Sequence, residues 1–167
     1  MTVSAKRNGL IWLVLTVVLL VVDWATKTLV INTMTVGQSI DILPVFNITY
    51  VHNPGAAFSF LSEAGGWQRW FLSAIAVAIS VLLVWWLKRL PASNKLLGCA
   101  YALVLAGALG NLYDRMVYGY VIDFIHVYYQ NWHYPKFNIA DCAICIGAAL
   151  LLIDAFKSSS KKESVNE

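Results

Sequence analysis

Two aspartates in the second half of the chain, Asp123 and Asp141, have the chemistry and the setting of a peptidase dyad. Asp123 lies in the apolar run Val-Ile-Asp-Phe-Ile at residues 121–125, and Asp141 lies at the start of an apolar segment. A carboxylate in such surroundings has a raised pKa or needs a partner. Two carboxylates that meet there share one proton, so that one activates a water molecule and the other polarises a carbonyl. This pattern predicts an aspartic peptidase.

Further polar residues lie within or beside apolar segments and could support this pair. Asp23 and Lys27 stand four positions apart with the acid first, the favourable order for an ion pair on a helix. A structural ion pair and a functional role both stay open for them. Asn138 could cap a helix whose first turn holds Asp141. Three polar residues end another apolar segment, namely Asn111, Asp114 and Arg115.

Other catalytic chemistries fit the sequence less well. The three histidines are scattered, and no H-E-x-x-H zinc motif occurs. Cys142 and Cys145 have C-x-x-C spacing inside an apolar run without a second ligand pair, which favours small packing residues. A serine mechanism would need a base such as Lys27 near Ser59, and nothing in the spacing favours it. We therefore expect no metal and no other cofactor.

Four apolar segments are long enough to cross a membrane, which requires about 20 mostly apolar residues. Of the 167 residues, 59% are hydrophobic and only 13% are charged, against roughly 25% charged in a soluble domain. We predict an α-helical integral membrane protein with spans at residues 10–31, 67–87, 96–113 and 139–156. The first segment could be a cleaved signal peptide, but no A-x-A site follows it. One domain is expected over residues 1–157, followed by a disordered polar tail at 158–167.

The distribution of charge predicts the orientation of these spans. The loops at residues 32–66 and 114–136 carry four acids against two cations. The other basic residues outside the spans flank them in alternate segments: Lys6, Arg7, Lys88, Arg89, Lys95, Lys157, Lys161 and Lys162. Since positive charge stays inside, both termini should be cytoplasmic and both acidic loops should face outward. The polar residues near the spans then gather at the outer leaflet.

The outer loops also show structural patterns. Polar and apolar residues alternate over residues 38–43 and 46–50, which predicts a small outer-face β-sheet. Residues 113–137 contain nine aromatic side chains, a density typical of a loop that lies on the bilayer interface. Within the third span, Gly98, Ala102, Ala106 and Gly110 form one row that continues to Asp114. Such a row of small residues allows another helix to approach closely.

Five blocks in order resemble the lipoprotein signal peptidases, the type II signal peptidases of bacteria. One departure from that family is Ala106. The family often has glycine at this position, and the alanine of this chain adds a methyl group to the packing face. The blocks are Asp23-Trp24-Ala25-Thr26-Lys27, Asn53-Pro54-Gly55-Ala56-Ala57-Phe58-Ser59, Gly107-Ala108-Leu109-Gly110-Asn111-Leu112-Tyr113-Asp114-Arg115, Val121-Ile122-Asp123-Phe124-Ile125 and Phe137-Asn138-Ile139-Ala140-Asp141.

The resemblance implies a four-helix aspartic endopeptidase of the bacterial inner membrane. Such an enzyme cleaves the signal peptide from diacylglyceryl-modified prolipoproteins just before the lipidated cysteine. Cleavage takes place where the outer face of the inner membrane meets water. The resemblance implies Asp123 and Asp141 as the catalytic pair, and Asp23 and Lys27 as a structural pair. The positions that it implies as supporting the site are Asn53, Gly107, Asn111, Arg115, Asn138 and Ala140. The expected partners are the prolipoprotein and membrane lipid, with no nucleic acid and no obligate protein partner.

A small proton-coupled transporter or channel subunit is the alternative, because acids inside a membrane also mark ion pathways. Asp23, Asp123 and Asp141 would then carry the protons. The even number of spans and the lack of polar residues across the inner half argue against a pore through the membrane. A membrane scaffold without catalysis would not explain why two acids flank an apolar loop.

Overall fold

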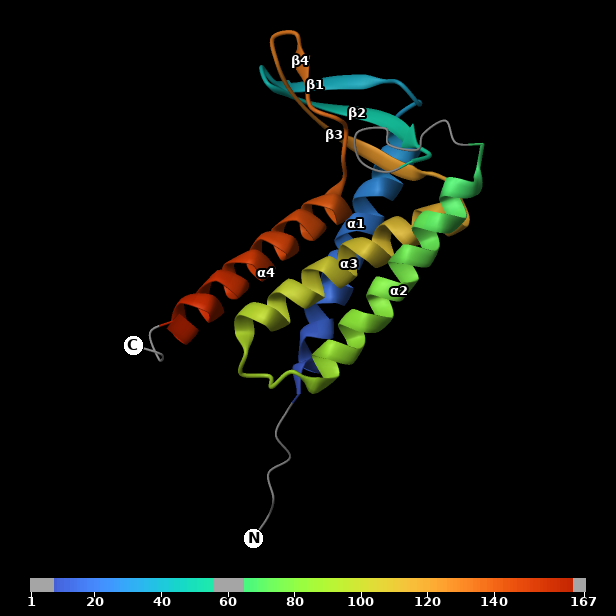
Figure 1. Cartoon of the computed structure of the whole chain (residues 1–167). Helices are drawn as coiled ribbons and strands as arrows, with labels where there is room; N and C mark the ends of the chain where they lie inside the picture. The colour runs from blue at the N-terminus through green and yellow to red at the C-terminus, as the bar shows by residue number, and fades with distance from the viewer. Residues whose placement is uncertain (1–7, 56–64, 164–167) are drawn as a thin grey trace.

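Four long helices form a bundle, and a small sheet covers one end of it (Figure 1). The computed structural model describes residues 8–55 and 65–163, and the side chains of residues up to 157. The helices are α1 (Leu13–Thr33), α2 (Trp67–Arg89), α3 (Lys95–Val117) and α4 (Ile139–Glu163). A short 3-10 helix, η1 (Gly9–Trp12), leads into α1. All four helices are long and apolar enough to span a membrane, which confirms the four predicted spans.

The helices extend beyond the predicted spans where the local sequence allows it. Lys88 and Arg89 extend α2 and lie in its last turn, where cations favour the negative end of the helix dipole. The Asn94 side chain accepts a hydrogen bond from the backbone N–H of Leu97 and so fixes the start of α3. The predicted disordered tail is wrong for its first part, because α4 continues to Glu163. No glycine or proline interrupts residues 158–163, so nothing there ends the helix.

Helix α3 is the central helix and packs against the other three. Its predicted row of small residues faces α1, where Gly98 lies under the Trp12 ring and the Thr16 hydroxyl donates to the Ala102 carbonyl. A neighbouring face of α3 contacts α4. There Gly107 leaves room for the backbone carbonyl of Ala140. The close approach of both helices to α3 follows from these missing or short side chains.

The sheet is antiparallel with the order β1 (Ser39–Leu43), β2 (Phe46–Asn53), β3 (Val121–Tyr129) and β4 (Trp132–His133). The small sheet predicted from the alternation over residues 38–43 and 46–50 is confirmed, and β1 and β2 form an antiparallel pair there. The prediction of an aromatic loop is wrong in its local structure, because β3 and β4 fill much of that region. Residues 121–129 are rich in β-branched and aromatic side chains, which favour a strand, and they pair with β2.

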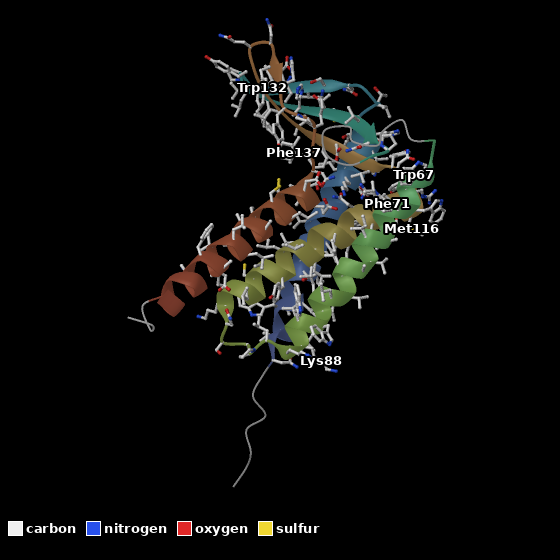
Figure 2. The ribbon with its side chains drawn as sticks, viewed as in Figure 1. Trp67, Phe71, Lys88, Met116, Trp132 and Phe137 are labelled. Atoms are coloured by element: carbon white, nitrogen blue, oxygen red, sulfur yellow. The ribbon has the colours of Figure 1, made fainter. Side chains whose placement is uncertain are left out.

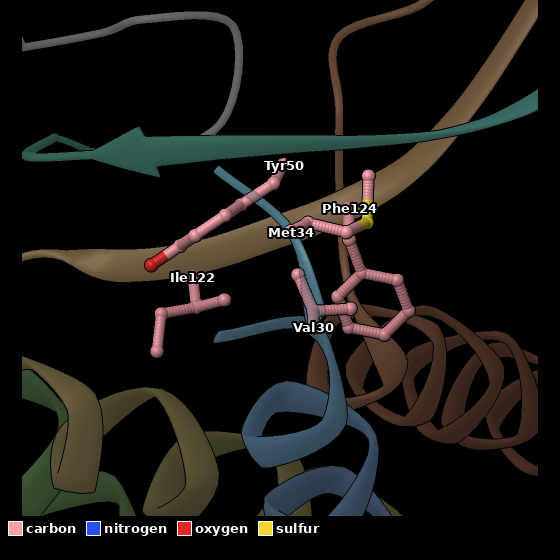
Figure 3. Packing of buried hydrophobic residues seen from close by; sticks show 5 residues of the cluster. All are labelled: Val30, Met34, Tyr50, Ile122 and Phe124. Carbon is pink, nitrogen blue, oxygen red and sulfur yellow. The ribbon is translucent and has the colours of Figure 1, made fainter. Parts of the chain in front are cut away.

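An apolar cluster fixes the sheet to the bundle (Figure 3). Val30 and Met34 at the end of α1 pack against Tyr50 of β2 and against Ile122 and Phe124 of β3. Because side chains alternate along a strand, residue 123 between the last two points to the opposite face of β3. The cluster thereby sets which way the side chain at position 123 faces.

Candidate active site

Asp123 and Asp141 come from different elements and are joined through the side chain of Asn138. Asp123 lies in β3, and Asp141 lies in the first turn of α4. The Asn138 amide donates to Asp123 Oδ1 at 2.8 Å, and Asn138 Oδ1 accepts the backbone N–H of Asp141 at 3.0 Å. The two aspartates singled out from the sequence therefore belong to one hydrogen-bonded cluster.

Asn138 also caps helix α4, as its position suggested. Its backbone N–H donates to Asp141 Oδ2 at 3.2 Å, while its side chain accepts the N–H of Asp141. This reciprocal arrangement is a capping box, in which a cap side chain and a first-turn side chain each satisfy the other's backbone. Asn138 is completely buried. The start of α4 and the position of Asp141 are thus fixed by the same pair of residues.

Two further amides hold the remaining carboxylate oxygens. The Asn53 amide donates to Asp123 Oδ2 at 2.9 Å, and the Asn111 amide donates to Asp141 Oδ1 at 2.7 Å. Asn53 reaches Asp123 because β2 pairs with β3 at this point. Each carboxylate consequently accepts a hydrogen bond on both of its oxygens, which fixes the orientation of both groups.

The burial of Asp123 changes its acidity. The residue is only 1% exposed. Burial, together with the nearby charge of Asp141, raises the pKa of Asp123 to about 7, against the opposing effect of the hydrogen bonds from Asn53 and Asn138. A carboxyl group with this pKa is about half protonated at pH 7, whereas an ordinary aspartic acid is almost fully ionised there.

Arg115 lies beside this cluster and holds backbone rather than a carboxylate. Its guanidinium donates to the carbonyl of Gly55 at 2.9 Å and to the carbonyl of Asn111 at 3.2 Å. Gly55 follows β2, and its N–H donates to the side chain of Asn53. Arg115 thus connects α3 to the segment that positions Asn53.

A buried ion triad lies next to the aspartate pair. Lys27 Nζ lies 2.8 Å from Asp23 Oδ2 and 2.8 Å from Asp114 Oδ2, and all three side chains are almost fully buried. The ion pair predicted from the spacing of Asp23 and Lys27 is confirmed. The spacing of residues does not predict that Asp114, which continues the row of small residues on α3, is the second acid that pairs with Lys27. Lys27 also lies 3.3 Å from Asn111 Oδ1, which links the triad to Asp141.

The triad holds the backbone immediately before each aspartate of the pair. Asp23 Oδ1 accepts the N–H of Ala140 at 2.9 Å, and Asp114 Oδ2 accepts the N–H of Ile122 at 3.1 Å. Ala140 precedes Asp141, and Ile122 precedes Asp123. Ala140, and Gly107 packed against its carbonyl, thus lie beside the aspartate pair without contributing a polar side chain.

The competing chemistries gain no support from the site. Lys27 is held between two carboxylates, which leaves it unsuited to act as a base for a serine. Ser59 lies outside the described residues. In the part of the chain that the structure describes, no group of three His, Cys, Asp or Glu side chains is arranged to hold a metal ion. Cys142 and Cys145 are free thiols on α4.

Comparisons with known proteins agree with this geometry. The model of a family described as signal peptidase (SPase) II matches residues 15–157. A lipoprotein signal peptidase of Pseudoalteromonas translucida is 71% identical over 163 residues, which are 98% of either chain. One of Alteromonas mediterranea is 57% identical over 161 residues, covering 96% of this chain and 88% of the relative.

Two solved structures have the same fold. A bacterial membrane enzyme determined by the in meso method at 2.3 Å is 34% identical, with a TM-score of 0.82 and 90% coverage of either chain. A second one, at 1.9 Å, is 33% identical, with a TM-score of 0.79, and the match covers 92% of this chain and 98% of that chain.

Replacing Lys27 tests the importance of the buried triad. Lys27→Met leaves the carboxylates of Asp23 and Asp114 buried without the cation between them, so we expect a loss of about 3–5 kcal/mol in the free energy of unfolding. Lys88→Met, at an exposed lysine in α2, should change it by less than about 0.5 kcal/mol. Circular dichroism during unfolding in detergent micelles measures both variants.

A triple variant separates lost charge from lost packing. Adding Asp23→Asn and Asp114→Asn to Lys27→Met removes both charges and keeps the oxygens that accept the N–H groups of Ala140 and Ile122. Stability should then recover in part. Equal stability of Lys27→Met and Lys88→Met would show that the triad does not hold the fold together.

Proposed function

Since the chain belongs to the signal peptidase II family, whose members are lipoprotein signal peptidases, we propose that Asp123 and Asp141 are its catalytic pair. The protein is a multi-pass membrane enzyme. It is an aspartic endopeptidase that removes the signal peptide from diacylglyceryl-modified prolipoproteins, just before the lipidated cysteine. The main support for this pair is that the side chain of Asn138 forms hydrogen bonds with both residues, with the carboxyl group of Asp123 and with the backbone N–H of Asp141.

The raised pKa of Asp123 supports a division of roles within the pair. Asp141 removes a proton from a water molecule, and the oxygen of that water attacks the carbonyl carbon of the scissile peptide bond. Protonated Asp123 donates its proton to the carbonyl oxygen, which gives a neutral tetrahedral diol. On collapse, the proton held by Asp141 passes to the leaving nitrogen, the C–N bond breaks and a hydroxyl proton returns to Asp123. Every proton is accounted for, and the pair ends in its starting state.

The remaining site residues act as positioning groups in this proposal. The amides of Asn53, Asn111 and Asn138 hold the two carboxyl groups in fixed orientations, so little reorganisation is needed during the reaction. Arg115 fixes the segment after β2 through the Gly55 carbonyl. Asp23 and Lys27 belong to the triad that fixes the backbone, which is a structural role.

The transporter alternative finds no support. Asp23 would have to bind and release protons, yet its two oxygens are engaged by Lys27 and by the N–H of Ala140. The relatives that match over nearly the whole chain are peptidases. Asp123 and Asp141 therefore fit a catalytic pair better than two stations of an ion pathway.

The arrangement of charged and aromatic side chains supports a location and an orientation. We infer that the protein lies in the bacterial inner membrane with both termini in the cytoplasm and the active site facing the periplasm. Lys88 lies at the end of α2 that is remote from the sheet, whereas Trp67 and Phe71 lie at the sheet end (Figure 2). Cations at one end and the acidic loops at the other follow the positive-inside rule.

In this orientation the hairpin of β3 and β4 rests on the membrane surface. Trp132, which is 60% exposed, contacts Tyr134, and Tyr134 contacts Phe137 just before α4. Figure 2 shows Trp132 on the hairpin and Phe137 near the start of α4. Tryptophan and tyrosine are enriched at membrane interfaces. A substrate whose lipidated cysteine is anchored in the bilayer would present its scissile bond at this depth.

Substitution of each aspartate tests the catalytic assignment. Asp123→Asn and Asp141→Asn should each lower kcat for a diacylglyceryl-modified prolipoprotein by about 10²-fold to 10⁴-fold, because each removes one proton-transfer group. The matched control is Asp41→Asn on the exposed strand β1, which should keep wild-type turnover. Purified protein in lipid vesicles is assayed by the mass of the product, with and without EDTA. Normal turnover in either active-site variant would refute the pair.

The pH dependence of cleavage tests which aspartate holds the proton. Since the pKa of Asp123 is raised to about 7, the group is protonated below that pH and loses its proton above it. Turnover should therefore decline by about tenfold per pH unit above about pH 7. Asn53→Ala removes a hydrogen bond that favours the ionised carboxylate, so its alkaline limb should move to higher pH. Asn131→Ala, in the exposed turn between β3 and β4, serves as control. If turnover of Asn53→Ala declines at the same pH as in wild type, or at a lower pH, Asp123 is not the group that holds the proton.

Reporter fusions test the orientation. Alkaline phosphatase needs disulfides that form outside the cytoplasm. A fusion after residue 131, in the turn between β3 and β4, should be active, and a fusion after residue 93, between α2 and α3, should be inactive. Immunoblots of both fusions control for the amount of protein. The reverse pattern of activity would place the site in the cytoplasm.

A further inference from the structure

A groove of about 360 Å³ lies between α1 and α3. Leu109 and Tyr113 of α3 line it, and they stand two residues before and two residues after Asn111. At 100° per residue, both are about 160° around the helix from Asn111, whose amide binds Asp141. These two residues therefore face away from the aspartate pair, whereas the floor of the groove is formed by Asp23 and Asp114, which hold the backbone beside that pair.

The walls of the groove are apolar and open to the surface of the bundle. Val17, Leu20, Val21 and Trp24 of α1 form one wall. Val17, Val21, Trp24 and Tyr113 are 46–58% exposed. Because α1 and α3 are membrane-spanning helices, this opening faces lipid rather than water.

The floor of the groove does not require a polar ligand. Gly110 has no side chain there, so the carboxylates of Asp23 and Asp114 reach the floor. Asp23 is engaged by Lys27 and by the N–H of Ala140, and Asp114 is engaged by Lys27 and by the N–H of Ile122. Since both acids are already satisfied, hydrocarbon is a suitable occupant.

The shape and direction of the groove fit a chain that lies along the helices. From Val17 to Trp24 the wall on α1 runs for about 10 Å along the helix axis. Trp24 and Tyr113 line the end nearer the sheet, and such residues prefer the membrane interface. A lipid with its headgroup at this end would extend its acyl chain between Leu20 and Leu109.

We propose that this groove binds one acyl chain of a bilayer glycerophospholipid. The bound chain keeps water away from the floor, where Lys27 pairs with Asp23 and Asp114. Exclusion of water strengthens these ion pairs, because charges interact more strongly in a medium of low dielectric constant. The lipid thereby stabilises the triad that fixes the backbone of Asp123 and Asp141. The proposal depends on the membrane-spanning bundle and not on the catalytic assignment.

The test compares lipid retention in two tryptophan variants of α1. Val21→Trp fills the groove, whereas Val18→Trp adds the same bulk to a similarly exposed residue, 52% against 56%, outside the groove lining. Native mass spectrometry of protein mixed with phosphatidylglycerol in detergent should show one retained lipid in wild type and Val18→Trp. Retention should fall at least tenfold in Val21→Trp. Equal retention in the two variants overturns the proposal.

A second measurement on the wild-type chain covers the case in which Val21→Trp does not fold. Phosphatidylglycerol with a diazirine on its acyl chain should crosslink to residues 17–24 of α1 and to Leu109 or Tyr113. Crosslinks spread over the helices without preference for this groove overturn the proposal. Displacement of the lipid by a diacylglyceryl-modified prolipoprotein peptide would also overturn it, because the groove would then belong to the substrate. Retention and crosslinking need no turnover, so a failed catalytic assignment leaves both readouts intact.

Discussion

The burial of Lys27 between Asp23 and Asp114 is the interaction on which the rest of the structure depends. Taking three charged groups out of water is costly, and the cost is offset only when every group finds close partners. Here each carboxylate meets the lysine at 2.8 Å and also accepts a backbone N–H. Those N–H groups belong to α4 and β3, so satisfying the charges also fixes α1, α3, α4 and β3 against one another.

Asn138 shows how stability and function use the same atoms. Its side chain caps α4 and also donates to Asp123, so the polar groups that start the helix are the ones that join the two aspartates. A buried polar group must find partners to avoid a large desolvation cost. In this site the partners are the proposed catalytic carboxyl groups. The requirement for complete hydrogen bonding therefore holds the pair in position before any substrate binds.

Much of the architecture could be predicted because it depends on local pattern. Apolar length predicts the four helices, and the spacing of Asp23 and Lys27 predicts their ion pair. Asp114 was missed as the second acid, because its contacts with Lys27 and Ile122 depend on how α1 and β3 meet α3. The aromatic content of residues 113–137 predicts a loop, although over residues 121–129 the preference for a strand and the register with β2 decide the structure. Tertiary contacts of this kind carry no short-range signal.

The two sides of α3 connect the chemistry to the membrane. One side presents Asn111 to Asp141, the opposite side presents Leu109 and Tyr113 to the groove along α1, and Gly110 lies between these two sides. Only a short side chain at position 110 lets Asp23 lie against α3, and the same absence of bulk creates the groove. The close helix contact that builds the site thus leaves a space open to lipid. Because dispersion contacts are lost wherever such a space stays empty, the surrounding bilayer contributes to the packing of the triad.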